Sequence, residues 1–176
     1  MRDITTQELS ECIATLKRGD TILLTGVIHT ARDAAHQRLA ELLRDGNPMP
    51  VELNGMIIYY CGPCPARPGM PIGSCGPTTS SRMDPFTPLM LEHGVRAVIG
   101  KGKRSPAVKD ALKKYGAVYL AATGGVAALF AEKVKNSSLV AFPDLGPEAI
   151  YRLEVERLPL IVAIDSHGGD IFESSK

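Results

Sequence analysis

Hydroxyl groups and one arginine are concentrated in the sequence G-P-T-T-S-S-R-M-D, residues 76–84. Four consecutive hydroxyl side chains, which begin with Thr78 and Thr79, precede Arg82. Hydroxyls and backbone N–H groups bind carboxylate or phosphate oxygens, and an arginine can hold a carboxylate through two parallel hydrogen bonds. A plain turn with capping serine and threonine residues is the alternative interpretation. The length of the segment and its density of polar groups favour an anion-binding loop.

Two further cations follow apolar runs. Arg32 comes after the run at residues 21–28, and we expect it in the first turn of a helix, where unpaired N–H groups and the helix dipole attract anions. The alternative is a surface arginine paired with a neighbouring carboxylate. Lys101 stands at the end of the run V-R-A-V-I-G, although the surrounding G-K-G-K-R-S lacks the spacing of a phosphate-binding P-loop. Arg32, Arg82 and Lys101 together favour a dianionic small molecule, such as a dicarboxylate, as the ligand.

Sulfur chemistry is the competing hypothesis, because the sequence also contains Cys61-Gly-Pro-Cys64 and, further on, Cys75. A Cys-x-x-Cys pair is typical of thiol redox proteins, and several cysteines can also bind a metal. The prolines that follow Cys64 oppose the regular helix of a redox pair, and the remaining Cys12 lies far back in an expected helix. We therefore expect loop thiols packed as small residues and no metal ligand in this chain. A thiol redox or metal-binding protein that uses Cys61 and Cys64 is the alternative.

The elements that must position these residues alternate along the chain between apolar, β-branched runs and amphipathic segments. This alternation predicts an α/β layered domain, with N-caps at Thr30, Asp84 and Ser105. Open α/β sheets bind ligands outside the carboxyl ends of their strands, which is where the candidate residues fall. The predicted strands are 21–28, 56–60, 95–100, 117–122, 138–142 and 158–165, and the predicted helices are 30–46, 84–94, 105–116 and 123–134.

The chain has 176 residues, which suits one compact domain over residues 1–176. Its 20 basic and 19 acidic residues nearly balance, and no block of lysine and arginine indicates a nucleic-acid partner. No segment approaches the roughly 20 apolar residues that cross a membrane, and the N-terminus lacks the apolar run of a signal peptide. We therefore expect a cytoplasmic protein with no nucleic-acid or membrane partner.

Five segments of the chain carry a family resemblance when they are taken together and in this order. They are T-A-R-D-A-A-H-Q-R-L, G-S-C-G-P-T-T-S-S-R-M-D, K-G-K-R-S, A-A-T-G-G-V-A-A-L-F and L-E-V-E-R-L-P-L-I-V-A-I-D. These segments resemble the class I, iron–sulfur-dependent hydro-lyases. The similarity is to the β subunit of the two-subunit fumarate hydratase and L(+)-tartrate dehydratase type, which is equivalent to the C-terminal domain of single-chain members, and it covers nearly the whole chain.

The resemblance implies a swivelling β/β/α domain that pairs with a separate α subunit in a hetero-oligomer. In that family the α subunit holds a [4Fe-4S] cluster through three cysteines, and its open iron binds the hydroxyl and a carboxylate of a C4-dicarboxylate. Carried over motif by motif, Arg32, Arg82 and Lys101 bind the substrate carboxylates. Thr78 lies near the proton that is transferred next to a carboxylate, and Thr79 is a supporting donor.

The leading hypothesis is therefore the β subunit of a class I fumarate hydratase, which interconverts (S)-malate and fumarate plus water and is active only with its α subunit. The runner-up is the β subunit of L(+)-tartrate dehydratase, which converts L-tartrate to oxaloacetate. The two substrates differ by one hydroxyl, and the residue that recognises this hydroxyl could belong to the α subunit.

Overall fold

A computed structural model describes residues 1–122 and 127–173 of the chain. The described strands form one seven-stranded sheet in the order β1-β2-β3-β4-β5-β7-β6. Strands β1 to β5 are parallel, and β7 runs antiparallel to its neighbours. The strands are β1 Arg2–Thr5, β2 Thr21–Thr30, β3 Ile57–Tyr59, β4 Ala97–Gly100, β5 Val118–Ala121, β6 Val134–Ala141 and β7 Ile150–Ile164.

The sheet closes on itself through β7, which pairs with both β2 and β5. This strand exchanges one neighbour for another along its length, since its first half lies beside β6 and its second half beside β5. Between the two halves Arg157 adopts a positive φ of 50° and donates its backbone N–H to the Thr25 hydroxyl. The register with β2 also shifts there, opposite Gly26, so the bend lets one strand serve two partners.

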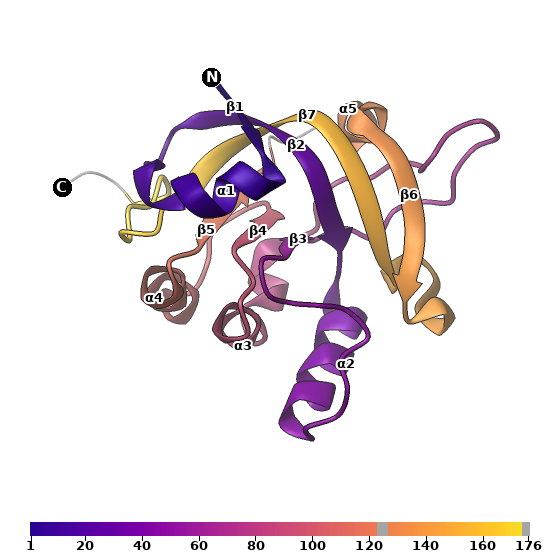
Figure 1. Cartoon of the computed structure of the whole chain (residues 1–176), viewed down its shortest axis with the longest axis horizontal. Coiled ribbons are helices and arrows are strands. Elements are labelled where there is room, and N and C mark those ends of the chain that lie inside the picture. The colour runs from indigo at the N-terminus through magenta and orange to yellow at the C-terminus, as the bar shows by residue number, and fades with distance from the viewer. Residues whose placement is uncertain (123–126, 174–176) are drawn as a thin grey trace.

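Helices cover both faces of the sheet, and each face has its own apolar core (Figure 1). Alternate residues of a strand point to opposite faces, so Ile57 and Tyr59 join one core while Ile58 and Tyr60 join the other. Helices α1 and α5 pack on the first core, and α2, α3 and α4 lie along the second. The helices are α1 Thr6–Cys12, α2 Asp33–Arg44, α3 Thr87–Glu92, α4 Pro106–Tyr115 and α5 Ala127–Lys133, with 3-10 turns η1 Ile13–Thr15, η2 Ser80–Met83 and η3 Pro143–Glu148.

The α/β prediction is confirmed. The helix whose start and end agree best with the predicted capping residues is α4. The Ser105 hydroxyl accepts the N–H of Val108, and Gly116 ends the helix in the left-handed conformation. The central strands also lie where they were predicted. At the C-terminal end, β6 begins at Val134 and β7 at Ile150, both earlier than expected, while β1 was not predicted at all. The start of the helix predicted over 123–134 lies outside the described residues.

Two predicted N-caps are wrong. Thr30 is the last residue of β2, where its buried hydroxyl bonds to the backbone of Ala149 and Tyr151. The strand therefore runs on, and α2 begins at Asp33 with Arg32 as its N-cap rather than in its first turn. Asp84 does not cap α3, which begins at Thr87. The Asp84 carboxylate instead accepts a hydrogen bond from the buried Arg104.

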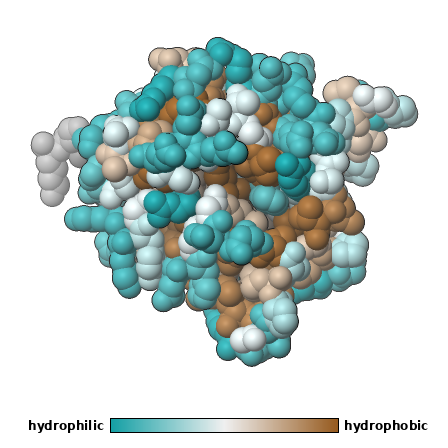
Figure 2. All heavy atoms as spheres, in the orientation of Figure 1, coloured by the Kyte–Doolittle hydropathy of each residue, from teal (hydrophilic) through white to brown (hydrophobic). Residues whose placement is uncertain are grey.

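The face shown in Figure 2 is mostly hydrophilic, with hydrophobic side chains at the right, where β6 ends in Figure 1, and at the bottom, where α2 lies. Exposed apolar residues of that strand are Leu139 and Val140. Across residues 1–122 and 127–173, no helix combines the length and the apolar character needed to span a membrane.

Candidate active site

Most of the candidate residues lie at the carboxyl edge of the parallel strands. Arg32 comes two residues after β2, and Lys101 directly follows β4. Thr78 lies far from β3 in sequence, but its N–H donates to the carbonyl of Tyr60, the residue after β3, at 2.7 Å. Carboxyl ends of neighbouring parallel strands meet at one edge, so three separate segments converge there.

Arg32 is held against the loop that follows β3. A Cβ added to Gly62 would lie 2.8 Å from Cδ of Arg32 and 2.9 Å from its Nη1, so a larger residue at position 62 would displace the Arg32 side chain. The Nε atom is buried without a hydrogen-bond partner among the described residues. Its ion-pair partner, the Glu148 carboxylate, is 3.8 Å away, which is too far for a hydrogen bond. The guanidinium therefore retains capacity for an anion.

The segment with the hydroxyl residues is joined to the end of β4. Thr79 forms a parallel bridge with Lys101, and the Ser80 N–H donates to the Lys101 carbonyl at 3.0 Å. The Lys101 N–H donates back to Oγ of Ser80 at 2.9 Å. Thr78 is half-buried, whereas Thr79 and Lys101 are exposed. The backbone thus brings Thr78, Thr79 and Lys101 close together.

Arg82 is joined to the start of α2. Its Nε donates to Oδ1 of Asp33 at 3.1 Å, and its Nη2 lies 3.0 Å from Oδ2 of the same carboxylate. Asp33 directly follows Arg32 in the chain, so this ion pair links the two arginines of the site. Lys101 differs from both, because the ion pairs within residues 1–122 and 127–173 do not include it.

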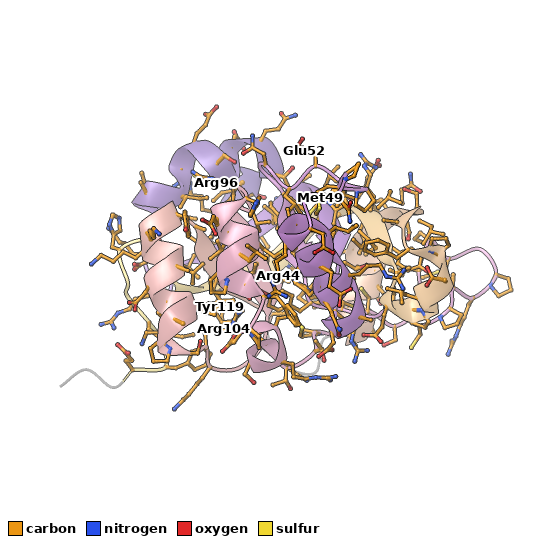
Figure 3. The ribbon with its side chains drawn as sticks, turned by 90° about the horizontal axis from the view of Figure 1, so that it is seen from below. Arg44, Met49, Glu52, Arg96, Arg104 and Tyr119 are labelled. Carbon is orange, nitrogen blue, oxygen red and sulfur yellow. The ribbon has the colours of Figure 1, made fainter. Side chains whose placement is uncertain are left out.

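A buried arginine beneath the site was missed by sequence reasoning, which considered its segment only for Lys101. Arg104 has no exposed side-chain surface, and its Nε donates to Oδ1 of Asp84 at 2.7 Å. Its Nη2 donates to Thr87 at 2.7 Å and to Tyr60 at 3.3 Å. The guanidinium also lies over the rings of Tyr60 and Tyr119, and Figure 3 shows Arg104 beside Tyr119 at one end of the helices. No local pattern predicts it, since its carboxylate partner is distant in sequence.

His36 lies one turn along α2 and is fully buried. Its Nδ1 is 2.8 Å from the carbonyl oxygen of Arg32, which can only accept, so this nitrogen carries the proton. Burial lowers the pKa of His36 to about 4. The ring packs edge-on against Tyr60, and at neutral pH it is an uncharged support for the backbone of Arg32.

The cysteines do not form the pair that the Cys-x-x-Cys spacing suggests. The Sγ atoms of Cys61 and Cys75 are 3.2 Å apart in the core, whereas Cys64 is exposed. In the part of the chain that the structure describes, no three His, Cys, Asp or Glu residues are grouped to hold a metal ion. Cys61 and Cys75 pack among apolar residues that include Tyr59 and Phe130. This donor arrangement does not fit the three thiolates of an iron–sulfur cluster.

Comparisons with known proteins agree on one family. A family model described as the fumarase C-terminus matches residues 2–175. "Fumarate hydratase 1, mitochondrial" of Leishmania major is 45% identical over 152 residues, which are 85% of this chain and 28% of that protein. "Fumarate hydratase class I, anaerobic" of Escherichia coli K12 is 43% identical with the same coverage. "Putative L(+)-tartrate dehydratase subunit beta" of Methanocaldococcus jannaschii is 44% identical over 90% of this chain and 84% of that protein. The chain thus spans about 28% of the length of these two fumarate hydratases.

Proposed function

Since this chain belongs to the fumarase C-terminus family, we propose that it is the β subunit of a class I fumarate hydratase. In this proposal the enzyme is a hydro-lyase that interconverts (S)-malate and fumarate plus water. The observation that supports the proposal most strongly is the meeting of Arg32, Thr78 and Lys101 at one edge of the sheet, with Arg82 joined to it through Asp33.

The chemistry of this edge suits a C4-dicarboxylate. Two guanidinium groups and one ammonium group can neutralise two carboxylates, and an arginine adds directional paired hydrogen bonds. In our proposal Arg32, Arg82 and Lys101 bind the carboxylates and Thr79 donates a supporting hydrogen bond. Thr78 lies next to the carbon that exchanges a proton. A neutral threonine is a weak base, so a carboxylate of the partner would share this task.

We assign the [4Fe-4S] cluster to the partner α subunit. Among the described residues, the buried pair Cys61 and Cys75 and the exposed Cys64 do not offer three converging thiolates, which supports this assignment. The cluster, bound on the partner, would supply Lewis-acid chemistry at the substrate hydroxyl. The residues of this chain would bind and orient the substrate and exclude water from it.

The proposed assembly is a hetero-oligomer of this chain with an α subunit in the cytoplasm. The curated fumarate hydratases named above are more than three times as long as their matched part, which leaves room for a second part within their own chains. The M. jannaschii relative is named as a beta subunit and matches over most of its length. We propose that residues 1–176 act as a single domain of the swivelling β/β/α type, which closes over the partner's cluster.

The second candidate is the β subunit of L(+)-tartrate dehydratase. What favours it is the M. jannaschii relative, whose name includes this activity and 84% of whose length is matched by this chain. The substrates share both carboxylates, so the cations proposed here would serve either one. Relative kcat/KM values on the two substrates separate the candidates.

The test is to co-express the chain with the neighbouring reading frame, purify the complex without oxygen, and assay malate, fumarate and L-tartrate. We expect hydratase activity in the complex and none in the chain alone. Arg82→Ala and Lys101→Ala should each lower kcat/KM by about 100-fold, because each removes a charged contact to the substrate. Lys103→Ala, at an exposed lysine two positions further on, is the matched control. Full activity of the isolated chain, or unchanged kinetics in the first two variants, would contradict the proposal.

A further inference from the structure

Two of the buried cysteines, Cys61 and Cys75, lie at the ends of the coil that runs from β3 to the hydroxyl-rich segment. Both have no exposed surface, and their Sγ atoms are 3.2 Å apart. A disulfide bond is about 2.05 Å long, so a movement of roughly 1 Å separates this contact from a covalent bond. The proposed hydratase chemistry uses neither thiol.

Each cysteine is also held in place by its surroundings. The Tyr59 hydroxyl donates to the carbonyl of Cys75 at 2.5 Å, and Cys61 directly follows Tyr60 at the end of the β3 segment. Across the coil, the Cys64 N–H donates to the Ser74 carbonyl at 2.9 Å, and the Gly73 N–H donates to the Cys64 carbonyl at 3.2 Å. These bonds align the two ends of the coil while Cys64 itself faces solvent. The fold therefore favours pairing of Cys61 with Cys75 over pairing with Cys64.

We propose that Cys61 and Cys75 are an oxidisable dithiol that forms a reversible disulfide under a two-electron oxidant such as a peroxide. Two S–H bonds break and one S–S bond forms. Hydrogen peroxide takes up the two electrons and two protons and becomes two waters. The bond closes a loop over residues 61–75. At one end of this loop Gly62 packs against Arg32, and Thr78 follows three residues after the other end. Oxidation would thus fix the segments that position two residues of the site.

Both cysteines are buried, so an oxidant would reach the pair when the coil opens locally. Apart from a few hydrogen bonds across the coil, residues 61–78 have no regular structure, and a cavity of about 420 Å³ beside the coil is lined by Cys64, Ile72 and Ser74. Coils with few hydrogen bonds open locally at low free-energy cost. The hydrogen bond with Cys75, together with burial, raises the pKa of the Cys61 thiol. The disulfide should therefore form more slowly than reagents modify Cys64, and faster as the pH rises.

The methionines of the chain allow a direct test. Cyanogen bromide cleaves after methionine, and Met56, Met70 and Met83 separate a peptide with Cys61 and Cys64 from a peptide with Cys75. The oxidant should be diamide, whose N=N bond is reduced to a hydrazine, because peroxides also convert methionine to the sulfoxide. The purified chain is oxidised, and its remaining thiols are alkylated in denaturant. The chain is then cleaved, and the peptide masses are measured by mass spectrometry with and without reductant.

We expect a reducible species that joins peptides 57–70 and 71–83, both in the wild type and in Cys64→Ser. Two separate peptides, with 57–70 lighter by two hydrogens, would mean a Cys61–Cys64 bond and would overturn the proposal. Loss of the joined species in Cys64→Ser would overturn it as well. Closing a loop of this length should raise the thermal unfolding midpoint of oxidised Cys64→Ser by about 6–12 °C over the reduced form. An unchanged or lower midpoint would show that the bond does not form in place.

Discussion

Arg82 meets a carboxylate of its own chain through one side of the guanidinium. The Nε atom donates a hydrogen bond to Asp33, Nη2 lies beside the same carboxylate in the ion pair, and the side chain is about half exposed. The Nη1 end is thus directed away from Asp33, and a substrate carboxylate could bind there without breaking the ion pair. Asp33 would then orient Arg82 rather than compete with the substrate for it.

His36 makes stability depend on pH. Its pKa of about 4 in the folded chain lies below the ordinary 6.5, so the unfolded chain binds a proton that the folded chain does not. The associated stability is complete above pH 6.5 and is lost as the pH falls from 6.5 to 4, by about 3 kcal/mol. We expect His36→Asn, which keeps a donor near the Arg32 carbonyl, to flatten this dependence in urea unfolding.

The control for this prediction is His93→Asn. His93 also bonds through Nδ1 to the carbonyl four residues earlier, but it is exposed, so this variant controls for the loss of that hydrogen bond alone. His29, whose pKa is lowered mainly by burial, contributes in the same direction in every variant and cancels in the comparison. An equal slope in the wild type and in His36→Asn would contradict the assignment.

At the scale of elements, η2 docks on the end of β4 because Gly100 has no side chain. A Cβ there would lie 2.0 Å from Oγ of Ser80 and 2.9 Å from the ring of Tyr60. The Ser80 hydroxyl also lies 3.0 Å from the hydroxyl of Tyr119, which donates to the carbonyl of Gly102. One serine therefore connects η2, β5 and the loop that carries Lys101.

Arg104 reinforces this connection, because Asp84 accepts both its Nε and the N–H of Ser105. Removing one partner of a buried ion pair leaves the other charge uncompensated. We expect Arg104→Met to lower the free energy of unfolding in urea by about 3–5 kcal/mol. Arg44→Met, at an exposed arginine that ends α2, should change it by less than about 0.5 kcal/mol.

The double variant Arg104→Met with Asp84→Asn gives the outcome that decides this prediction. Asp84→Asn removes the buried carboxylate charge that Arg104→Met leaves without a partner. The double variant should therefore lose less free energy of unfolding than the sum of the losses in the two single variants. Additive losses, or a loss in Arg104→Met no larger than in Arg44→Met, would show that the ion pair does not join the two loops.

At the scale of the whole molecule, local signals in the sequence predicted much of the fold. Apolar runs indicated β3, β4 and β5, and the Ser105 and Gly116 signals bounded α4 correctly. Thr30 was misassigned because its hydroxyl bonds to the backbone near residue 150, and no window around Thr30 contains that partner. The closure of the sheet by β7 has the same origin, since its partners are distant in sequence.

In the candidate site, too, local signals in the sequence predicted some features, whereas contacts between distant residues were not predictable. The segment types, their position after strands and the resemblance predicted which residues would gather at the edge of the sheet. The pairings themselves were not predictable, because Arg104 with Asp84 and Cys61 with Cys75 depend on which strands become neighbours. A spacing such as Cys-x-x-Cys reports only proximity along the chain, and here the tertiary contact is with another cysteine.

The closure by β7 has a consequence for how the protein acquires its structure. Strand β2 pairs with β7 along most of its length, between residues that lie more than a hundred positions apart. During synthesis β2 leaves the ribosome long before β7 has been made. The backbone N–H and C=O groups along one edge of β2 therefore lack their strand partner for seconds. Such distant pairing is slow to form, and we expect stopped-flow refolding on a millisecond-to-second scale, with tyrosine burial complete only when the last strand docks. Microsecond refolding would contradict this. We therefore expect the nascent chain to depend on chaperones until β7 pairs with β2 and closes the sheet.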